Sequence, residues 1–394
     1  MHGKALIDAL LAPIGLAGLI RDHWGRTALL LQHGGSDTPA GLPDVRTFRD
    51  LLLTLAAPAQ GWFSLVRVRG MPPAPAHLNA DGWVDGAAVW EEYRAGYSLL
   101  LNQVQRRHPG TARLCRALER DFARAGVLLG RHIGGNLYLS PPASQGFSIH
   151  YDPHDVLVIQ LAGRKHWRLY NRRFANPPRA PAEPIAPAEA GGIDAEIALD
   201  PGDCLYMPRG TLHEACTRDS QSLHMTLILE PLGWSDLLGE IMEADVDLRD
   251  RLPIGFGSGQ ADAAALARML ERLGESPAIA PAIAAMRARL LARLDRPVAD
   301  FASRAPLTID ADTEFSLAPG IFGFVTEDGD RAVLHLPGTH FAAVPEMAES
   351  FRMILKRARF RASDLPVRTA IAEKIALLQS LLDDGYLVPG NSLA

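Results

Sequence analysis

Residues 131–232 contain a succession of short β-type segments, and this succession limits the possible folds more than any other part of the sequence. Gly, Pro and Asp separate the segments, which read in chain order NLYLS, GFSIHYD, DVLVIQLAG, KHWRLY, EIALDPGDCLYMP and SLHMTLILE. Several short strands at close spacing with turn residues between them are typical of a β-sandwich or a barrel. A Pro/Ala-rich stretch at 176–192 interrupts the succession, and we expect it to form an exposed, extended loop.

Helical sequence flanks this β-rich core on both sides. Residues 110–127 have apolar side chains near one face at helical spacing and predict an amphipathic helix. After residue 233, two Ala/Leu/Arg-rich amphipathic helices are predicted at 262–274 and 281–295. These two helices could form a small bundle or a dimer interface.

The last part of the chain combines strands and helices. The stretch FGFVTEDGDRAVLHL predicts a β-hairpin with Asp328 and Gly329 at its turn. A helix around 346–357 is followed by a second helical stretch, Gly385 and a short strand. This helix–helix–strand order is compatible with a winged-helix module.

The length of the chain indicates more than one domain. It has 394 residues, 47% of them hydrophobic, which is more than one ordinary core needs. We therefore expect an α+β protein with three regions. The first is 1–232, with its β-rich core at 131–232; the second is the helical region 233–300, a candidate for dimerisation; the third is the winged-helix-like region 301–394.

Composition argues against several classes of protein. The formal net charge is −5, so nothing indicates a protein that is basic overall and coats nucleic acid. The three cysteines, Cys115, Cys204 and Cys216, are widely spaced and form no C-x-x-C, which argues against a disulfide framework and a thiolate zinc site. Charged residues and a proline interrupt the apolar N-terminus, so we expect neither a signal peptide nor a membrane span, and a cytoplasmic protein.

The segment GFSIHYDPHDV contains the candidate chemistry. If it is a strand, His150 and Asp152 project from one face about 7 Å apart at their Cα atoms. A third ligand must come from another strand, and His213, after the turns of DPGDCLYMPRGT, is a candidate. Two histidines and one carboxylate leave three positions open on an octahedral ion, as in the facial triad of non-haem Fe(II) oxygenases. A buried His–Asp hydrogen bond without a metal is the alternative.

Three nearby residues compete for the same role. His154 is four residues after His150, but Pro153 is expected to break the strand between them, so His154 is placed in a loop or facing a substrate. Asp155 opens the next apolar segment and is expected to cap a turn. His224 lies in a predicted strand and could line the pocket without binding a metal.

A wider pattern around these residues resembles a known family. The stretch 136–170 contains N-x-Y-x-x-P, Gly-Phe, H-x-D-x-x-D, an apolar strand ending in Gln and then G-R-K-x-W. The later stretches LDPGDCLYMPRGTLHEA and SLHMT continue the likeness. Together they resemble the JmjC-type cupin oxygenases, and more narrowly the ribosomal oxygenases, which hydroxylate ribosomal proteins. The resemblance implies a double-stranded β-helix, also called a cupin or jelly-roll fold.

The resemblance also implies roles for individual residues. His150, Asp152 and His213 would be the iron ligands, and Lys165 would pair with the distal carboxylate of 2-oxoglutarate. A dicarboxylate that is bound to iron at one end needs a cation at the other. The remaining cosubstrate candidates lie on strands that flank the pocket: Asn136, Tyr138 and, more weakly, Ser222 and Thr226.

The resemblance implies an Fe(II)- and 2-oxoglutarate-dependent dioxygenase that uses O₂ and releases succinate and CO₂. Its substrate would be a polypeptide side chain, with Arg or His of a ribosomal protein as the expectation, and the protein would be a homodimer. One alternative is a cupin metalloenzyme that does not use 2-oxoglutarate. The other is a non-catalytic RNA- or protein-binding module that uses the winged-helix-like tail, although residues 346–384 carry nearly balanced charge and give no strong nucleic-acid signal.

Overall fold

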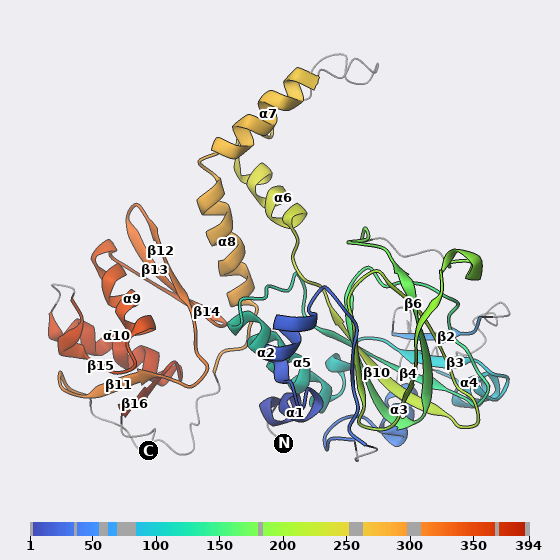
Figure 1. The fold of residues 1–394 in the computed structure, drawn as a ribbon. Coiled ribbons are helices and arrows are strands. Elements are labelled where there is room, and N and C mark those ends of the chain that lie inside the picture. Colours follow the sequence, from blue (N-terminus) through green and yellow to red (C-terminus); the bar gives the residue numbers. More distant parts are fainter. Residues whose placement is uncertain are drawn as a thin grey trace. The chain divides into compact units, whose positions relative to one another are not determined.

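The computed structural model describes residues 3–34, 38–54, 62–68, 84–179, 184–251, 263–297, 309–366 and 370–390. The chain divides into two compact units, Met1–Pro231 and Leu232–Ala394, and each is described by itself. Figure 1 shows that the first unit holds the two facing sheets, while the second combines helices with smaller sheets.

Two antiparallel sheets form the framework of the first unit. The larger has the strand order β1-β8-β5-β10-β4-β3-β2 and the smaller β7-β6-β9. The bounds are β1 (Leu29–Leu31), β2 (Phe63–Val66), β3 (Ser98–Leu101), β4 (Gly134–Ser140), β5 (Asp155–Gly163), β6 (Lys165–Arg173), β7 (Ile193–Leu199), β8 (Cys204–Met207), β9 (Thr211–Cys216) and β10 (Ser222–Leu229). Neighbours in the sheets are often distant in sequence, as expected for the JmjC cupin fold.

Apolar side chains from both sheets meet between them. Val156 and Val158 of β5 pack with Trp167 and Leu169 of β6 and with Leu205 of β8, all 5% exposed or less. Each such side chain contributes on the order of 1.5–3 kcal/mol through burial. This packing holds the small sheet against the large one.

Helices cover the other face of the large sheet. Their bounds are α1 (Gly3–Leu10), α2 (Gly15–Gly18), α3 (Val45–Leu53), α4 (Gly86–Arg94) and α5 (Pro109–Arg124). Helix α5 confirms the amphipathic helix predicted at 110–127: His108 caps its first turn by accepting the Thr111 N–H, and Leu118 and Phe122 are buried. Helix α1 packs against α5.

One local prediction needs correction. The segment 146–152 is a loop and not a strand; its regular pairing is limited to one antiparallel bridge between His150 and His213. The Pro/Ala-rich stretch is exposed at most of its described residues, 176–179 and 184–192, as predicted, but it is also anchored. Ile185 donates its N–H to the Ile149 carbonyl, and Ala190 is fully buried. Residues 180–183 of that stretch lie outside the described residues.

The second unit begins with three helices, α6 (Trp234–Ala244), α7 (Ala263–Glu275) and α8 (Ile279–Ala292). Helix α6 packs against α8, and α8 also contacts β13 and β14. The helices predicted at 262–274 and 281–295 are therefore present, each within a few residues of its predicted bounds.

Two three-stranded sheets complete the second unit, with the orders β12-β13-β14 and β15-β11-β16. The bounds are β11 (Glu314–Leu317), β12 (Phe324–Asp328), β13 (Arg331–Leu336), β14 (Thr339–Ala343), α9 (Ala348–Lys356), β15 (Phe360–Arg361), α10 (Ile371–Asp383) and β16 (Leu387–Pro389). The predicted hairpin is present, but Asp328 pairs with Arg331, so its turn is Gly329–Asp330, one residue later than predicted. The order α9, α10, β16 matches the predicted helix–helix–strand order.

None of the helices within the described ranges combines the length and apolarity that crossing a membrane requires.

Candidate metal centre

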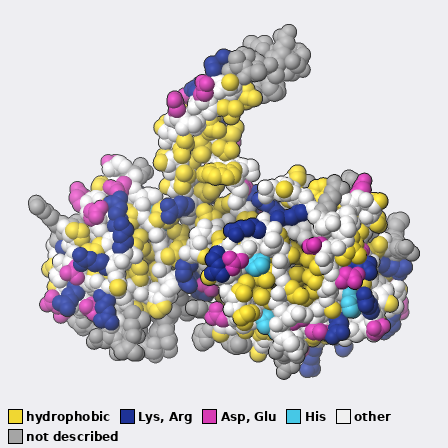
Figure 2. Space-filling model, viewed as in Figure 1, with side chains coloured by type: hydrophobic (Ala, Val, Ile, Leu, Met, Phe, Trp, Pro, Cys, Tyr) yellow, Lys and Arg dark blue, Asp and Glu magenta, His cyan; other side chains and the backbone are white. Residues whose placement is uncertain are grey.

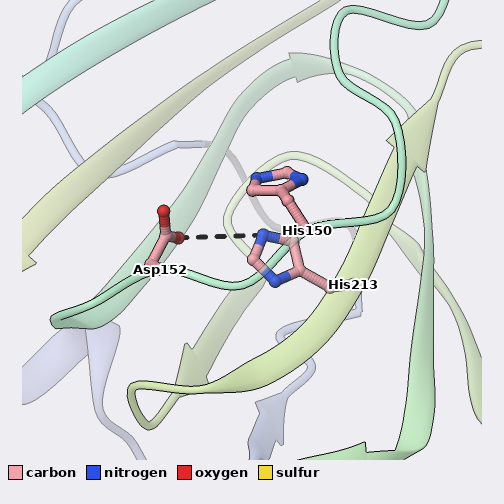
Figure 3. Close-up of side chains that lie close together, drawn as sticks. All are labelled: His150, Asp152 and His213. Atoms are coloured by element: carbon pink, nitrogen blue, oxygen red, sulfur yellow. Dashed lines mark ion pairs between the residues drawn. The ribbon is translucent and has the colours of Figure 1, made fainter. Parts of the chain in front are cut away.

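Three side chains from two separate segments of the chain converge in the first unit. His150 and Asp152 come from the loop before β5, and His213 comes from β9. One ligand atom from each can be chosen so that all three lie within 4.8 Å of one another, which suits a single metal ion. Figure 3 shows the carboxylate of Asp152 facing the ring of His213, with 3.7 Å between Oδ2 and Nε2.

The backbone fixes the two histidines relative to each other. The His150 N–H donates to the His213 carbonyl at 3.1 Å, and the His213 N–H donates back to the His150 carbonyl at 2.8 Å. The two residues therefore form a directly opposed antiparallel pair. A strand was not needed to bring them together, since one bridge is sufficient.

Hydrogen bonds also select the tautomer of each ring. His150 Nδ1 lies 2.7 Å from the Ser148 carbonyl and His213 Nδ1 lies 2.9 Å from the Thr211 carbonyl. Because a carbonyl oxygen only accepts, both Nδ1 atoms must carry a proton, so in the neutral form of each ring the lone pair is on Nε2. Burial and the neighbouring His150 lower the pKa of His213 to about 4, so its ring is neutral at pH 7. The arrangement offers two imidazole nitrogens and one carboxylate to a metal.

The loop that carries Asp152 is held by the turn before β9. The Gly210 N–H donates to the Asp152 carbonyl at 2.9 Å. Asp155 is 1% exposed and accepts the Arg209 N–H at 3.0 Å and the Tyr206 hydroxyl, so it caps that turn as predicted and is not part of the triad. Burial raises the pKa of Asp155.

The triad borders a cavity of about 330 Å³ between the two sheets. Its lining includes the three triad residues, Lys165, Tyr138, His224, Thr226 and Trp167. At its edge, Phe147 is 41% exposed, and its ring centroid lies 5.5 Å from that of His150. The cavity therefore joins the candidate metal site to buried polar groups and to solvent.

Lys165, the first residue of β6, is buried in this cavity. It is only 3% exposed, and its Nζ donates to Ser140 Oγ at 2.8 Å. Ser140 Oγ is also within 2.8 Å of Ser98 Oγ, and both serines line the cavity. Burial lowers the pKa of Lys165 to about 8. A buried ammonium next to hydroxyl groups is arranged to receive a carboxylate.

Tyr138 and His224 form one wall of the cavity. Their rings stack with centroids 4.7 Å apart and planes at 3°. Burial raises the pKa of Tyr138, so its phenol stays protonated, and burial lowers the pKa of His224 well below its usual value, so its ring stays neutral. His224 lines the cavity, as expected, and is not one of the three residues grouped around the metal position.

The other cosubstrate candidates have different surroundings. Asn136 lies on the same face of β4 as Tyr138, but its side-chain oxygen accepts the Gln103 N–H at 3.1 Å and it is not among the residues that line the cavity. Ser222 is fully buried, accepts from Gln160 Nε2 at 2.9 Å and is likewise outside the lining. Neither residue is placed for direct contact with a ligand in this cavity.

The sequence reasoning missed Ser140, Ser98 and Phe147. Ser140 follows Tyr138 by two residues on β4, so strand alternation places both side chains on one face. That spacing was a usable signal for Ser140. Ser98 comes from β3, which pairs with β4, and nothing local in its sequence points to the site.

Comparison with known proteins agrees with the fold. Residues 101–237 match the family model described as JmjC domain. Ribosomal oxygenase 1 of Gallus gallus is 33% identical over 288 residues, covering 66% of this chain and 44% of the relative. The bifunctional lysine-specific demethylase and histidyl-hydroxylase NO66 of Dictyostelium discoideum is 35% identical over 186 residues, covering 46% of this chain and 35% of the relative.

A solved structure of YcfD, a ribosomal oxygenase from Escherichia coli in complex with cobalt and 2-oxoglutarate, aligns with 95% of this chain and 98% of its own chain. The TM-score is 0.46 and the sequence identity 17%.

The fold and the family match define a protein with a JmjC domain of the cupin type. The curated relatives narrow this further: the chain is a ribosomal oxygenase-like JmjC protein. It spans less than half the length of these relatives, so their activities and substrates do not transfer to it directly.

Proposed function

We propose that this protein is an Fe(II)- and 2-oxoglutarate-dependent oxygenase that hydroxylates a polypeptide side chain. The observation that carries the proposal is the His150–Asp152–His213 triad in one cavity with the buried Lys165. Two imidazoles and one carboxylate are the donor set of the non-haem Fe(II) facial triad, which leaves three positions for other ligands. The matching JmjC domain and the oxygenase names of the relatives support the same chemistry.

Bound iron would supply the activation of O₂, by which 2-oxoglutarate is oxidised to succinate and CO₂ and one oxygen atom enters a C–H bond of the substrate. The chain's own residues have the remaining tasks. The Nε2 atoms of His150 and His213 and the carboxylate of Asp152 hold the metal, with both rings oriented by main-chain carbonyls.

The cosubstrate is oriented by the opposite wall of the cavity. Lys165 pairs with the distal carboxylate of 2-oxoglutarate, and Ser140, which already contacts Lys165, can donate its hydroxyl to the same carboxylate. The protonated phenol of Tyr138 is a third donor from the same face of β4. The stacked ring of His224 excludes water from this end of the cavity.

The proposed substrate follows from the names of the relatives. One relative is named for histidyl hydroxylation and lysine demethylation, and another is named a ribosomal oxygenase. For this chain we propose an Arg or His side chain of a ribosomal protein, which would enter past the exposed ring of Phe147 at the edge of the cavity.

The helical region of the second unit supports dimerisation as part of the proposal. Trp234, Leu238 and Met242 are spaced by four residues along α6 and are 80%, 39% and 47% exposed, and Leu266 and Leu270 of α7 are 62% and 59% exposed. Figure 2 shows hydrophobic side chains gathered along these helices. A second copy of the chain would cover both stripes. The winged-helix-like nature of the tail, residues 301–394, remains a prediction. We propose that this tail has an architectural role.

Succinate formation from 2-oxoglutarate by the full chain with Fe(II) and ascorbate tests the proposed chemistry. We expect slow turnover without substrate that is lost in His150→Ala, since removing one of three ligands abolishes the metal site. Intact-mass analysis of candidate peptides should show a gain of one oxygen atom. A chain that binds Fe(II) but neither binds nor consumes 2-oxoglutarate would instead be a cupin metalloenzyme of another kind.

Dimerisation and the binding-module alternative have separate tests. Sedimentation of the full chain and of a Leu266→Asp/Leu270→Asp variant measures dimerisation, and a monomeric wild type contradicts it. Salt-dependent binding of the full chain to single-stranded RNA, unchanged in His150→Ala, would favour the binding-module alternative.

A further inference from the structure

The three residues of the triad are attached to the protein in two different ways. His150 and His213 are fixed by their mutual backbone hydrogen bonds, but Asp152 takes no part in that pair. Its carbonyl instead accepts the Gly210 N–H at 2.9 Å. Gly210 directly precedes β9, the strand that carries His213. The position of Asp152 relative to His213 therefore depends on the turn before β9, residues 208–210.

Asp155 attaches the same turn to the segment 150–155, which we call the metal loop. Its carboxylate accepts the Arg209 N–H at 3.0 Å, and Arg209 is the neighbour of Gly210. Consecutive residues of the turn thus bond to two points of the metal loop, the Asp152 carbonyl and the Asp155 side chain. Asp155 is only 1% exposed, and burial strengthens its hydrogen bonds. Two attachments fix the orientation of the turn, which a single hydrogen bond would leave free to pivot.

The second oxygen of Asp155 extends this network to the N-terminal turn, residues 24–26. The Tyr206 hydroxyl donates to Asp155 Oδ2 and accepts the Gly25 N–H at 2.8 Å. The Tyr206 ring is 1% exposed and stacks on Trp24, with centroids 5.8 Å apart and planes at 16°. Because a phenol hydroxyl has one proton and a backbone N–H only donates, the direction of both hydrogen bonds is fixed. A change in the N-terminal turn thus reaches Asp155 through one side chain.

Arg173, the last residue of β6, joins the two turns by a second route. It donates to the carbonyls of Gly25 and Arg26, at 3.0 and 2.8 Å. It also donates to the Arg209 carbonyl at 3.1 Å. The N-terminal turn is therefore tied to the turn before β9 both by this guanidinium group and by the buried phenol and carboxylate.

We propose that Asp155 is a positioning residue of the metal centre, which fixes Asp152 relative to His213. Through Tyr206 it also makes the metal affinity depend on the N-terminal turn. Neither Asp155 nor Tyr206 lines the cavity of the triad, so each acts on the ion through the turn before β9. This rests on the proposed function only in that the triad binds a metal, and it depends on neither 2-oxoglutarate nor the substrate.

A purely structural role for Asp155 is the alternative, since removing a buried hydrogen-bond acceptor destabilises any fold. Asp203 provides a matched case. It is 2% exposed, and its carboxylate accepts the N–H groups of His33 at 2.8 Å and Asp200 at 2.9 Å. Its turn leads into β8, which carries no residue of the triad. Asp203→Asn thus removes a buried charge of the same kind away from the metal loop.

Metal binding by the full-length protein tests the proposal. The metal-free protein is titrated with Mn(II) well below its melting temperature, and free Mn(II) is measured by electron paramagnetic resonance. Asp155→Asn keeps an oxygen for the Arg209 N–H but places an amide NH₂ opposite the Tyr206 hydroxyl, and Tyr206→Phe removes that hydroxyl. We expect each to weaken Mn(II) binding roughly two- to tenfold, the range that one hydrogen bond provides. In the double variant the losses should not add, because both changes remove the same hydrogen bond.

The absorption spectrum of the Co(II)-loaded protein is a readout that a loss of stability alone does not change, because it reports how the ligands are arranged around the ion. Asp155→Asn and Asp203→Asn should both melt at lower temperature than the wild type. The Co(II) spectrum should change only in Asp155→Asn, and Asp203→Asn should keep the wild-type affinity for Mn(II).

Wild-type affinity and spectrum in Asp155→Asn, or equal weakening of Mn(II) binding in Asp203→Asn, overturns the positioning role. Unchanged affinity in Tyr206→Phe overturns the link to the N-terminal turn. Should Asp155→Asn not fold, Tyr206→Phe decides the test, because it removes the same hydrogen bond and leaves the carboxylate in place. Wild-type affinity in that variant then overturns the whole proposal.

The proposed function is tested separately by succinate formation. A wild type that binds no Mn(II) overturns the metal centre and the positioning role with it. A wild type that binds Mn(II) with an affinity that Asp155→Asn does not change contradicts only the positioning role. A protein that loses affinity in Asp155→Asn, but whose wild type does not consume 2-oxoglutarate, contradicts only the proposed chemistry.

Discussion

Replacing Lys165 by methionine removes a buried charge and keeps most of the side-chain volume. Burial lowers the pKa of Lys165 to about 8, whereas an unfolded chain gives lysine a pKa of about 10.4. At about 1.36 kcal/mol per pKa unit, the charged ammonium destabilises the fold by about 3 kcal/mol at pH 7. Losing the hydrogen bond to Ser140 offsets about 1 kcal/mol of this. We therefore expect Lys165→Met to raise the free energy of unfolding by about 2 kcal/mol.

The sign of this effect depends on pH. Between pH 8 and the ordinary lysine pKa, the unfolded chain binds more protons at this position than the folded chain, so the wild type gains stability as the pH rises. Below pH 8 the destabilisation is fully present. The difference between wild type and Lys165→Met should thus be largest near pH 7 and decrease towards pH 10.

The same substitution should weaken the binding of 2-oxoglutarate. A hydrogen bond to a charged group contributes on the order of 1.5–3 kcal/mol, so KM for 2-oxoglutarate should rise by roughly 10- to 150-fold. Thermal melting of the metal-free protein at pH 7 and pH 10 measures the first effect, with Tm of Lys165→Met higher by roughly 4–8 °C at pH 7. Succinate formation at varied 2-oxoglutarate measures the second.

Arg164→Met is the matched control, because Arg164 is the preceding residue and pairs with Asp200 at the surface, 54% exposed. It should leave KM unchanged and lower stability slightly, by about 0–1 kcal/mol. Lys165→Met with lower stability than the wild type and an unaltered KM would refute the reasoning on both counts.

Three further predictions concern neighbouring features. In Gly210→Ala the new Cβ would lie 1.8 Å from the Phe174 carbonyl oxygen at a backbone φ of +78°, so we expect a fall in Tm and loss of bound Mn(II), measured by melting and by metal analysis; an unchanged Tm contradicts this. Ser140→Ala should raise KM for 2-oxoglutarate by roughly three- to tenfold while Ser222→Ala leaves it unchanged, and equal effects would remove Ser140 from the site. KM for 2-oxoglutarate should also rise as the pH passes about 8, where Lys165 loses its charge, and this rise should be absent in Lys165→Met.

Sequence reasoning located the centre of the site but for partly wrong reasons. His150 and Asp152 were chosen because side chains two residues apart share a face of a strand, yet the segment is a loop and one bridge to His213 does the positioning. Main-chain pairing between residues 63 positions apart depends on the whole sheet, so no local pattern could reveal it. The strand argument offered His213 only as a candidate third ligand, and the wider motif then implied it as an iron ligand.

Ser222 shows a second limit. It lies on β10 in alternation with His224, which lines the cavity, so periodicity alone places both on one face. The pairing of β10 with β5 shifts between Leu223 and His224, and Ser222 instead contacts Gln160 beyond that irregularity. Bulges of this kind depend on tertiary contacts, which a single sequence does not reveal.

The mutual backbone bridge between His150 and His213 has a consequence for how metal enters the protein. In domains that fold only around their metal, ligand assembly and chain folding are one event, and chelation unfolds the domain. Here main-chain hydrogen bonds fix the two histidine backbones, and two carbonyl acceptors orient both imidazoles, so the sheet itself positions these ligands. We therefore expect a chelator to lower metal occupancy while the melting transition of the barrel is retained, and loss of that transition on chelation would contradict this.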